Sequence, residues 1–286
     1  MHRAHPCSIT SDVVAGDGRG LVVIAGPCVL ESPETNLLIG TTLADTCRDL
    51  GLRLVFKASF DKANRSSLHS ARGPGLAAGL DELARLRERL GVPVCTDIHE
   101  PAQAPRAAEV VDLLQIPAFL CRQTDLLAAC GETGRAVSVK KGQFLAPAEM
   151  RHVITKLRES GASGIMLTER GTFFGYHRLV NDFIGLGDLM DFGYPVCFDV
   201  THSTQLPGGG ASTTDGRPER AALLARAAVA AGVDAIFLET HPDPPKALSD
   251  AATVQPLSEV PALLALLARL HAVVAEASVV GEPEVR

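Results

Sequence analysis

The amino-acid sequence predicts an α/β fold, a single-domain (β/α)₈ TIM barrel. Eight short apolar runs alternate along the chain with eight segments that have helical patterning. Within each run the apolar residues are continuous rather than alternating, which is typical of parallel strands buried on both faces. The length of 286 residues suits one barrel, since this fold commonly takes about 250 residues. A doubly wound open sheet is the alternative for the same alternation.

The expected strands are rich in Val, Leu, Ile and Ala. They cover residues 21–25, 52–58, 92–96, 111–116, 136–140, 164–168, 195–200 and 235–239. The first helix begins at Ser32, with Pro33 at its first position, and stops at Gly51. The second spans residues 75–90 and stops at Gly91. The remaining helices are expected over residues 101–109, 124–130, 147–160, 179–191, 218–231 and 260–274.

No linker rich in Pro, Gly and Ser divides the chain, so we expect one catalytic domain. The barrel should cover residues 21–275, with residues 1–20 an N-terminal extension or barrel-bottom cap and 276–286 a C-terminal tail. The stretch PGGGASTTDG (207–216) follows the seventh strand and predicts a mobile loop on the catalytic face. Neither GxGxxG after the first strand nor GxxxxGK[ST] occurs, which argues against a nucleotide-binding loop.

Composition excludes several classes of function. The net charge of −6 argues against a nucleic-acid partner, which requires a basic surface. No run of 18 apolar residues predicts a membrane span, and the N-terminus lacks the apolar segment of a secretion signal. The 7 cysteines are irregularly spaced without a CxxC pair, as is typical of free thiols in a reducing compartment. We therefore expect a cytoplasmic enzyme.

Ionisable residues gather where the expected strands end. These residues include Cys28, Lys57, Asp97, Lys140, Arg170, His202 and Glu239. Strand ends meet at one mouth of a barrel, where the chemistry takes place. One or two polar ends would be ordinary surface, whereas ionisable groups at nearly every end favour a functional site. The cations among them, together with Lys62, indicate an anionic substrate with phosphate and carboxylate groups.

A second set contains groups that bind metals. Cys28, His202, Glu239 and Asp250 offer a thiolate, an imidazole and two carboxylates, which suit Zn²⁺, Fe²⁺ or Mn²⁺. Each residue also has a plainer interpretation, because Cys28 could fill the core, His202 could lie in a loop and Asp250 could cap a helix. Convergence at the barrel mouth would favour a divalent metal. The sequence leaves open which metal is bound and whether it is catalytic or structural.

Long motifs run through most of the chain. They are KASFDKANRSS (57–67), RGPG (72–75), TDIHEP (96–101), QIPAFLCRQTDLL (115–127), VKKGQF (139–144), ERGTFFGY (169–176), FDVTHSTQ (198–205) and ETHPDPPKALSD (239–250). With these motifs the sequence resembles the 3-deoxy-D-manno-octulosonate 8-phosphate synthase family, whose members join phosphoenolpyruvate to arabinose 5-phosphate. The resemblance covers residue 21 to the C-terminal helix, and motifs of this length are highly specific.

The resemblance implies a (β/α)₈ barrel, a homotetramer and that condensation reaction. Metal-dependent members of the family carry Cys in the first-strand motif where the metal-independent members carry Asn. Here the motif is AGPCVLES (25–32), so the chain, through Cys28, resembles the metal-dependent group. The resemblance then implies that Cys28, His202, Glu239 and Asp250 bind the divalent metal.

The resemblance also implies how the substrates bind. The phosphate of phosphoenolpyruvate would meet Lys140, Arg170 and the backbone N–H of Ala118, with Lys57 and Lys62 near its carboxylate and bridging oxygen. The sugar phosphate and hydroxyls would meet Asn64, Arg65 and Ser66, with Arg122 contributing across a subunit boundary. Asp97 and Gln115 would orient the cations. Catalytic roles would fall to Lys62, Asn64, Asp97 and His202.

The loop after the seventh strand departs from the family pattern. Residues 213–217 (TTDGR) replace a Ser-Gly-Gly-Arg-like run, which leaves the role of Arg217 open. Two other functions are weighed against the first. The seven-carbon synthase that uses erythrose 4-phosphate typically lacks the Asn-Arg-Ser-Ser tetrad, so Asn64 separates the two enzymes. A non-catalytic sugar-phosphate-binding protein would not need the intact Lys62, Lys140, His202 and Glu239.

Overall fold

Eight parallel strands close into a barrel in the computed structural model, which describes residues 2–64, 67–209 and 215–279. The strands are β3 (Val22–Gly26), β4 (Arg53–Lys57), β5 (Val94–Asp97), β6 (Leu113–Ile116), β7 (Ala136–Lys140), β8 (Gly164–Glu169), β11 (Val196–Asp199) and β14 (Ala235–His241). Each strand pairs in parallel with the next, including β11 with β14, and β14 pairs with β3 to complete the circle. The predicted (β/α)₈ barrel is thereby confirmed and the open sheet is excluded.

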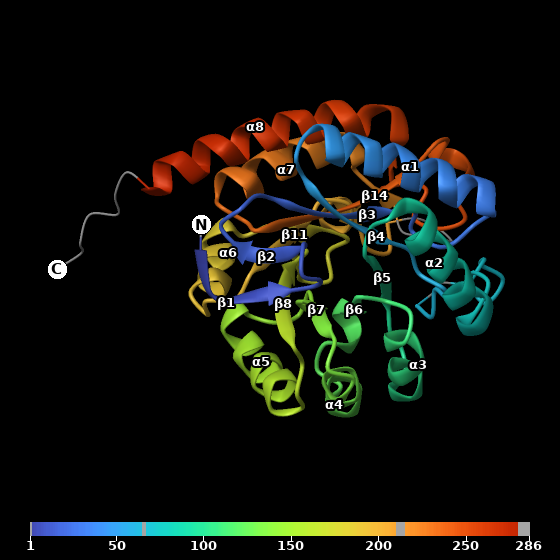
Figure 1. The fold of residues 1–286 in the computed structure, drawn as a ribbon, viewed down its shortest axis with the longest axis horizontal. Helices are drawn as coiled ribbons and strands as arrows, with labels where there is room; N and C mark the ends of the chain where they lie inside the picture. Colours follow the sequence, from blue (N-terminus) through green and yellow to red (C-terminus); the bar gives the residue numbers. More distant parts are fainter. Residues whose placement is uncertain (1, 65–66, 210–214, 280–286) are drawn as a thin grey trace.

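Eight helices surround the barrel (Figure 1). They are α1 (Pro33–Asp49), α2 (Leu76–Leu90), α3 (Ala104–Ala108), α4 (Thr124–Glu132), α5 (Met150–Glu159), α6 (Phe183–Met190), α7 (Ala221–Ala230) and α8 (Val260–Val279). Short 3₁₀ turns are η1 (Pro101–Gln103), η2 (Ala118–Leu120), η3 (Pro147–Glu149), η4 (His202–Thr204), η5 (Pro218–Arg220), η6 (Pro244–Lys246) and η7 (Leu257–Glu259).

Local chemistry accounts for where the helices begin and end. The Ser32 hydroxyl accepts a hydrogen bond from the Thr35 N–H and so caps α1. Gly91 ends α2 in the left-handed conformation, with φ of 64°. The prediction of a helix from residue 179 was wrong. Residues 179 and 180 form β10 (Leu179–Val180), which pairs with β9 (Thr172–Phe173), and α6 starts only after Asp182, whose carboxylate caps it.

An N-terminal hairpin lies against the end of the barrel where the strands begin. It consists of β1 (His2–Ser8) and β2 (Val14–Asp17), and Cys7 and Ala15 belong to one buried cluster with barrel residues such as Val22. Arg3 forms a buried ion pair with Asp234 at 2.8 Å, which ties the hairpin to the start of β14. The hairpin thus covers apolar side chains at that end of the barrel.

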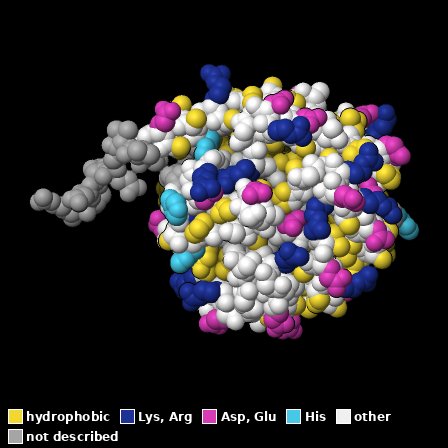
Figure 2. Space-filling view, viewed as in Figure 1, with side chains coloured by type: hydrophobic (Ala, Val, Ile, Leu, Met, Phe, Trp, Pro, Cys, Tyr) yellow, Lys and Arg dark blue, Asp and Glu magenta, His cyan; other side chains and the backbone are white. Residues whose placement is uncertain are grey.

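Helix α8 is long and apolar. By length and composition alone, residues 257–277 could cross a membrane, with a mean hydropathy of 1.6. In the fold, however, α8 packs along α7 and α1 (Figure 1), and Leu264 and Leu267 are fully buried. These contacts are those of the eighth barrel helix. On the face shown in Figure 2, acidic and basic side chains are interspersed rather than gathered into a basic stripe.

Candidate functional site

Three of the four predicted metal ligands meet at the mouth of the barrel. Cys28 follows β3, Glu239 lies on β14, and Asp250 lies in the segment before β15 (Gln255–Pro256). One ligand atom from each residue lies within 4.8 Å of the others, and the Cys28 thiol donates a hydrogen bond to Asp250 Oδ2 at 2.9 Å. His202 lies outside this trio but next to it, since its Nε2 is 3.5 Å from Glu239 Oε2.

A buried lysine connects this trio to β5. The Lys57 ammonium donates to Glu239 Oε1 at 3.0 Å and to the Ser59 hydroxyl at 3.0 Å, and it lies 3.8 Å from Asp97 Oδ1. Ser59 in turn donates to Asp97, whose other oxygen lies 3.0 Å from His99 Nε2. Two carboxylates from different strands therefore share one cation at the floor of the mouth.

A second lysine occupies the other side of the mouth. Lys140 Nζ donates to Asp199 Oδ2 at 2.6 Å and lies 3.4 Å from His202 Nδ1. It also lies 3.5 Å from the centre of the Phe237 ring, close enough for a cation–π interaction. Asp199 is fully buried and its carboxylate faces His202 Nδ1 at 2.9 Å, which leaves the Nε2 of that ring directed at Glu239.

Arg170 completes the cationic side of the site. Its guanidinium donates to the His202 carbonyl at 3.1 Å and to Gln205 Oε1 at 2.6 Å. The Gln205 amide then donates to Asp250 Oδ1 at 3.0 Å. The Arg170 Nε atom is buried without a hydrogen-bond partner among the described residues, so this guanidinium retains a donor for a ligand.

The charged groups in this cluster shift one another's pKa values. Burial raises the pKa of the Cys28 thiol, and the negative charges of Asp250 and Glu239 raise it further. Burial alone would also raise the pKa of Glu239, but the nearby charges of Lys57, His202 and Lys62 together outweigh it and lower that pKa to about 2. For Lys62, burial opposes the charged form, yet the nearby Cys28 and Glu239 charges raise its pKa overall.

The trio fits a divalent cation. Glu239 Oε2 is fully buried and has no hydrogen-bond partner among the described residues, which is costly for a carboxylate unless a cation meets it. Asp250 has a left-handed backbone with φ of 51°, a strained conformation for a residue other than glycine. One sulfur ligand with carboxylate oxygens suits Zn²⁺ or Fe²⁺, and the adjacent His202 nitrogen would add a fourth ligand.

The remaining predicted site residues differ in how far they are buried. Gln115 on β6 and Ala118 in η2 are buried, whereas Asn64 and Arg122 are exposed. Arg65 and Ser66 lie outside the described residues. Arg217 is half-exposed and pairs with Glu219 at 3.4 Å.

Two of the predicted substrate-binding cations also have partners within the protein. Lys57 and Lys140 already have carboxylate partners in Glu239 and Asp199. Asp199, Phe237 and Gln205 also contribute to the site, although their spacing predicted no role for them. Asp199 and Gln205 lie in the motif FDVTHSTQ, and Phe237 lies two residues before Glu239.

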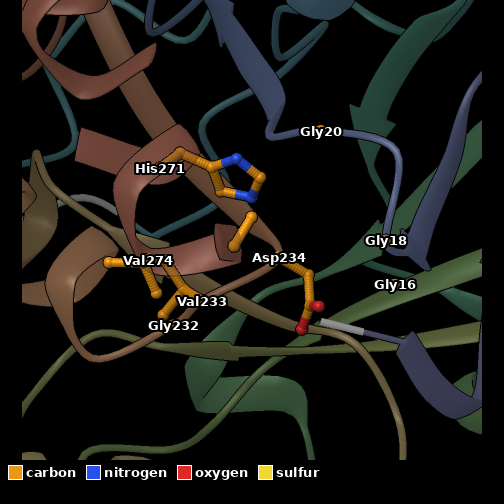
Figure 3. Close-up of a pocket in the computed structure, with 9 residues that line it drawn as sticks. Gly16, Gly18, Gly20, Gly232, Val233, Asp234, His271 and Val274 are labelled. Carbon is orange, nitrogen blue, oxygen red and sulfur yellow. The ribbon is translucent and has the colours of Figure 1, made fainter. Parts of the chain in front are cut away.

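A small pocket at the opposite end of the barrel is unrelated to this cluster. Gly16, Gly18 and Gly20 line it on one side, and His271 and Val274 of α8 line it on the other (Figure 3). Its one carboxylate, that of Asp234, is already held by Arg3. No predicted site residue is among those that line it.

Comparisons with known proteins identify the family of this chain. The sequence profile of the DAHP synthetase I family matches residues 4–275. A Trichlorobacter lovleyi protein named 2-dehydro-3-deoxyphosphooctonate aldolase is 53% identical over 92% of this chain and 96% of its own length. Proteins of the same name from Desulfotalea psychrophila (50% identical, 93% of this chain, 95% of the relative) and Nitratidesulfovibrio vulgaris (54%, 87% and 91%) are also similar. The chain therefore belongs to the DAHP synthetase I family.

Proposed function

We propose that this chain condenses phosphoenolpyruvate with D-arabinose 5-phosphate and water to give 3-deoxy-D-manno-octulosonate 8-phosphate and inorganic phosphate. The observation that carries the proposal is the barrel mouth, where Lys140 and Arg170 lie beside the trio of Cys28, Glu239 and Asp250. The shared name of the curated relatives supports the same product.

The anionic substrate has a defined place in this proposal. Arg170 contacts the His202 carbonyl and Lys140 lies near the His202 ring, and both would bind the phosphate of phosphoenolpyruvate, together with the N–H of Ala118. Lys57 and Lys62 would neutralise its carboxylate and bridging oxygen. Asp97 would hold Lys57 through the ion pair already present, and Gln115, its partner in the β5–β6 register, would support Asp97. The arabinose 5-phosphate would contact Asn64, Arg65 and Ser66.

The bond changes balance without a further reactant. C3 of phosphoenolpyruvate forms a bond to the aldehyde carbon, and the aldehyde oxygen takes a proton to become a hydroxyl. Water adds its oxygen to C2 and loses a proton, giving a phosphorylated hemiketal. The hemiketal then loses inorganic phosphate as its hydroxyl becomes the ketone. Lys62, which lies near Cys28 and Glu239, would stabilise the charged intermediates and supply the proton to the aldehyde oxygen.

We further propose that Cys28, His202, Glu239 and Asp250 hold a divalent metal (Zn²⁺, Fe²⁺ or Mn²⁺). When bound, such an ion would polarise the aldehyde or orient water by Lewis-acid action. Asp199 would fix the His202 ring through Nδ1, the arrangement that commonly orients an imidazole ligand. By accepting the Nδ1 proton, Asp199 would leave the His202 Nε2 free for the metal, and Lys140 would hold Asp199 through its own hydrogen bond to that carboxylate.

We also propose a homotetramer located in the cytoplasm. Phe119 and Phe144 are large apolar side chains that are about half exposed near Arg122, and they offer a surface for another subunit. All seven cysteines are free and buried, which suits a reducing compartment. Sedimentation of the purified chain tests the tetramer.

Phosphate release with two sugars tests the reaction. With phosphoenolpyruvate present, we expect rapid release with arabinose 5-phosphate and at least about 100-fold slower release with erythrose 4-phosphate, because contacts to hydroxyls discriminate strongly. A preference for erythrose 4-phosphate would favour the seven-carbon synthase. Tight binding without any release would favour a sugar-phosphate-binding protein.

A further inference from the structure

Gln205 contacts both Arg170, on the cationic side of the site, and Asp250, in the trio of predicted metal ligands. It is the first residue of β12 (Gln205–Leu206), which pairs with β13 (Asp215–Gly216), and it directly follows η4 with His202. Its amide oxygen accepts a hydrogen bond from Arg170 at 2.6 Å, and its amide nitrogen donates to Asp250 at 3.0 Å. One half-buried side chain therefore connects Arg170, the cation proposed to bind the substrate, with Asp250, a proposed metal ligand.

The chemistry of this bridge requires an amide. A guanidinium group only donates hydrogen bonds and a carboxylate only accepts them, so the connecting group must accept at one end and donate at the other. A glutamate would place a negative oxygen against Asp250, and a lysine would place a positive charge against Arg170. The neutral amide of glutamine satisfies both partners and has the length to reach both.

Because of this bridge, the two oxygens of the Asp250 carboxylate have different partners. Its Oδ2 faces the Cys28 thiol at 2.9 Å and accepts from the Ser249 hydroxyl at 3.0 Å, whereas its Oδ1 is held by Gln205. These contacts hold the Asp250 carboxylate beside Cys28, and the surrounding structure also holds the Asp250 backbone in the left-handed region. On the other side, the bond to Gln205 helps to fix the buried Arg170 guanidinium.

We infer that Gln205 is a positioning residue that couples the metal ligand Asp250 to the anion-binding Arg170. The inference deepens the proposed function and rests on it. Through Gln205, ordering of Arg170 by phosphoenolpyruvate also orders Asp250, so substrate and metal each raise the affinity for the other. By linkage, the two enhancement factors must be equal.

Cobalt titration of the full-length protein tests this inference. Co²⁺ bound through the Cys28 thiolate gives a charge-transfer band, so its dissociation constant can be measured without any turnover. In Gln205→Met we expect Co²⁺ affinity to fall by about 10- to 100-fold, the usual effect of losing an outer-shell partner. The increase in Co²⁺ affinity caused by phosphoenolpyruvate in wild type should shrink at least about threefold, and KM should rise for phosphoenolpyruvate more than for arabinose 5-phosphate.

Two further variants control for loss of structure. Gln103→Met loses an amide that accepts hydrogen bonds from the His99 and Glu100 N–H groups, so it should leave Co²⁺ affinity within about twofold of wild type. Gln205→Asn keeps the amide but is too short to reach both partners, so it should show the same losses if Gln205→Met does not fold.

The outcomes separate the inference from the proposed function. Co²⁺ and phosphoenolpyruvate affinities that stay at wild-type values in folded Gln205→Met and Gln205→Asn would overturn the inference, while wild-type turnover would leave the proposed function intact. A wild-type chain that binds no Co²⁺ overturns both the inference and the proposed metal site. If wild type binds Co²⁺ and phosphoenolpyruvate with mutual enhancement but releases no phosphate, the proposed reaction fails and the coupling through Gln205 stands.

Discussion

The thiol of Cys28 donates a hydrogen bond to Asp250, a residue 222 positions later in the chain, at 2.9 Å. Closure of the barrel produces this contact. Strand β14 pairs with β3 so that Glu239 lies opposite Gly26, two residues before Cys28. The segment between β14 and β15 then returns Asp250 to the same place. The metal proposal thus depends on the pairing of the first and last barrel strands.

Removal of the thiol should remove the metal. In Cys28→Ala we expect Co²⁺ affinity to fall by more than about 100-fold, beyond the usual effect of an outer-shell change, together with loss of the thiolate charge-transfer band. Cys47→Ala, which removes a buried thiol in α1, serves as the control and should keep both. A Cys28→Ala enzyme that remains fully active after chelator treatment would disprove the metal proposal.

Lys57 should matter for stability as well as for activity. Lys57→Met fills similar space but leaves the buried carboxylates of Glu239 and Asp97 without their shared cation. Breaking a buried pair in this way commonly costs about 3 to 5 kcal/mol. Urea unfolding should reveal this loss, whereas Lys246→Met, at an exposed surface pair, should change little. Equal stability of the two variants would rule out this role for Lys57.

Gly26 allows β3 and β4 to approach each other at the mouth. A Cβ atom at this position would lie 2.1 Å from the Lys57 carbonyl oxygen, so Gly26→Ala must shift the backbone that carries Lys57. We expect a loss of at least about 1 to 3 kcal/mol in the free energy of unfolding, together with lower activity. Gly187→Ala is the matched control, because its Cβ would meet nothing within 4 Å inside α6. That variant should gain about 0.5 to 1 kcal/mol.

The Asp17–Arg53 pair predicts how stability depends on pH. Burial alone would raise the pKa of Asp17, but hydrogen bonds from the Arg53 side chain and the Arg19 N–H, together with the charges of both arginines, outweigh it and lower the pKa below its usual range. The pair therefore stabilises the fold fully above about pH 4, the unfolded pKa, and its contribution is lost as pH falls through the lowered folded pKa.

Urea unfolding across this range checks the effect. The difference in stability between wild type and Asp17→Asn should be largest near neutral pH and should shrink toward pH 2. Asp12→Asn, at an exposed aspartate in the same hairpin, is the matched control for removing one carboxylate. A difference between wild type and Asp17→Asn that stays constant with pH would refute the assignment.

Much of the fold could be predicted because continuous apolar runs and helix caps are local features. Ser32 and Gly91 mark helix ends that the structure confirms. Leu179 and Val180 could not be assigned, because a two-residue strand is set by its partner β9 and not by its own pattern. In the site, Lys140 and Arg170 were identifiable as strand ends. Their partners Asp199 and Gln205 depend on side-chain directions that spacing alone does not reveal.

The mass of the product formed from phosphoenolpyruvate and arabinose 5-phosphate, with and without a chelator, is the most direct test of the central claim. Metal-loaded protein should yield the eight-carbon 2-keto sugar acid phosphate and one equivalent of inorganic phosphate, and chelation should suppress both. Undiminished product formation after complete metal removal would contradict the role given to the trio of Cys28, Glu239 and Asp250. Absence of the eight-carbon product from metal-loaded protein would contradict the proposed reaction itself.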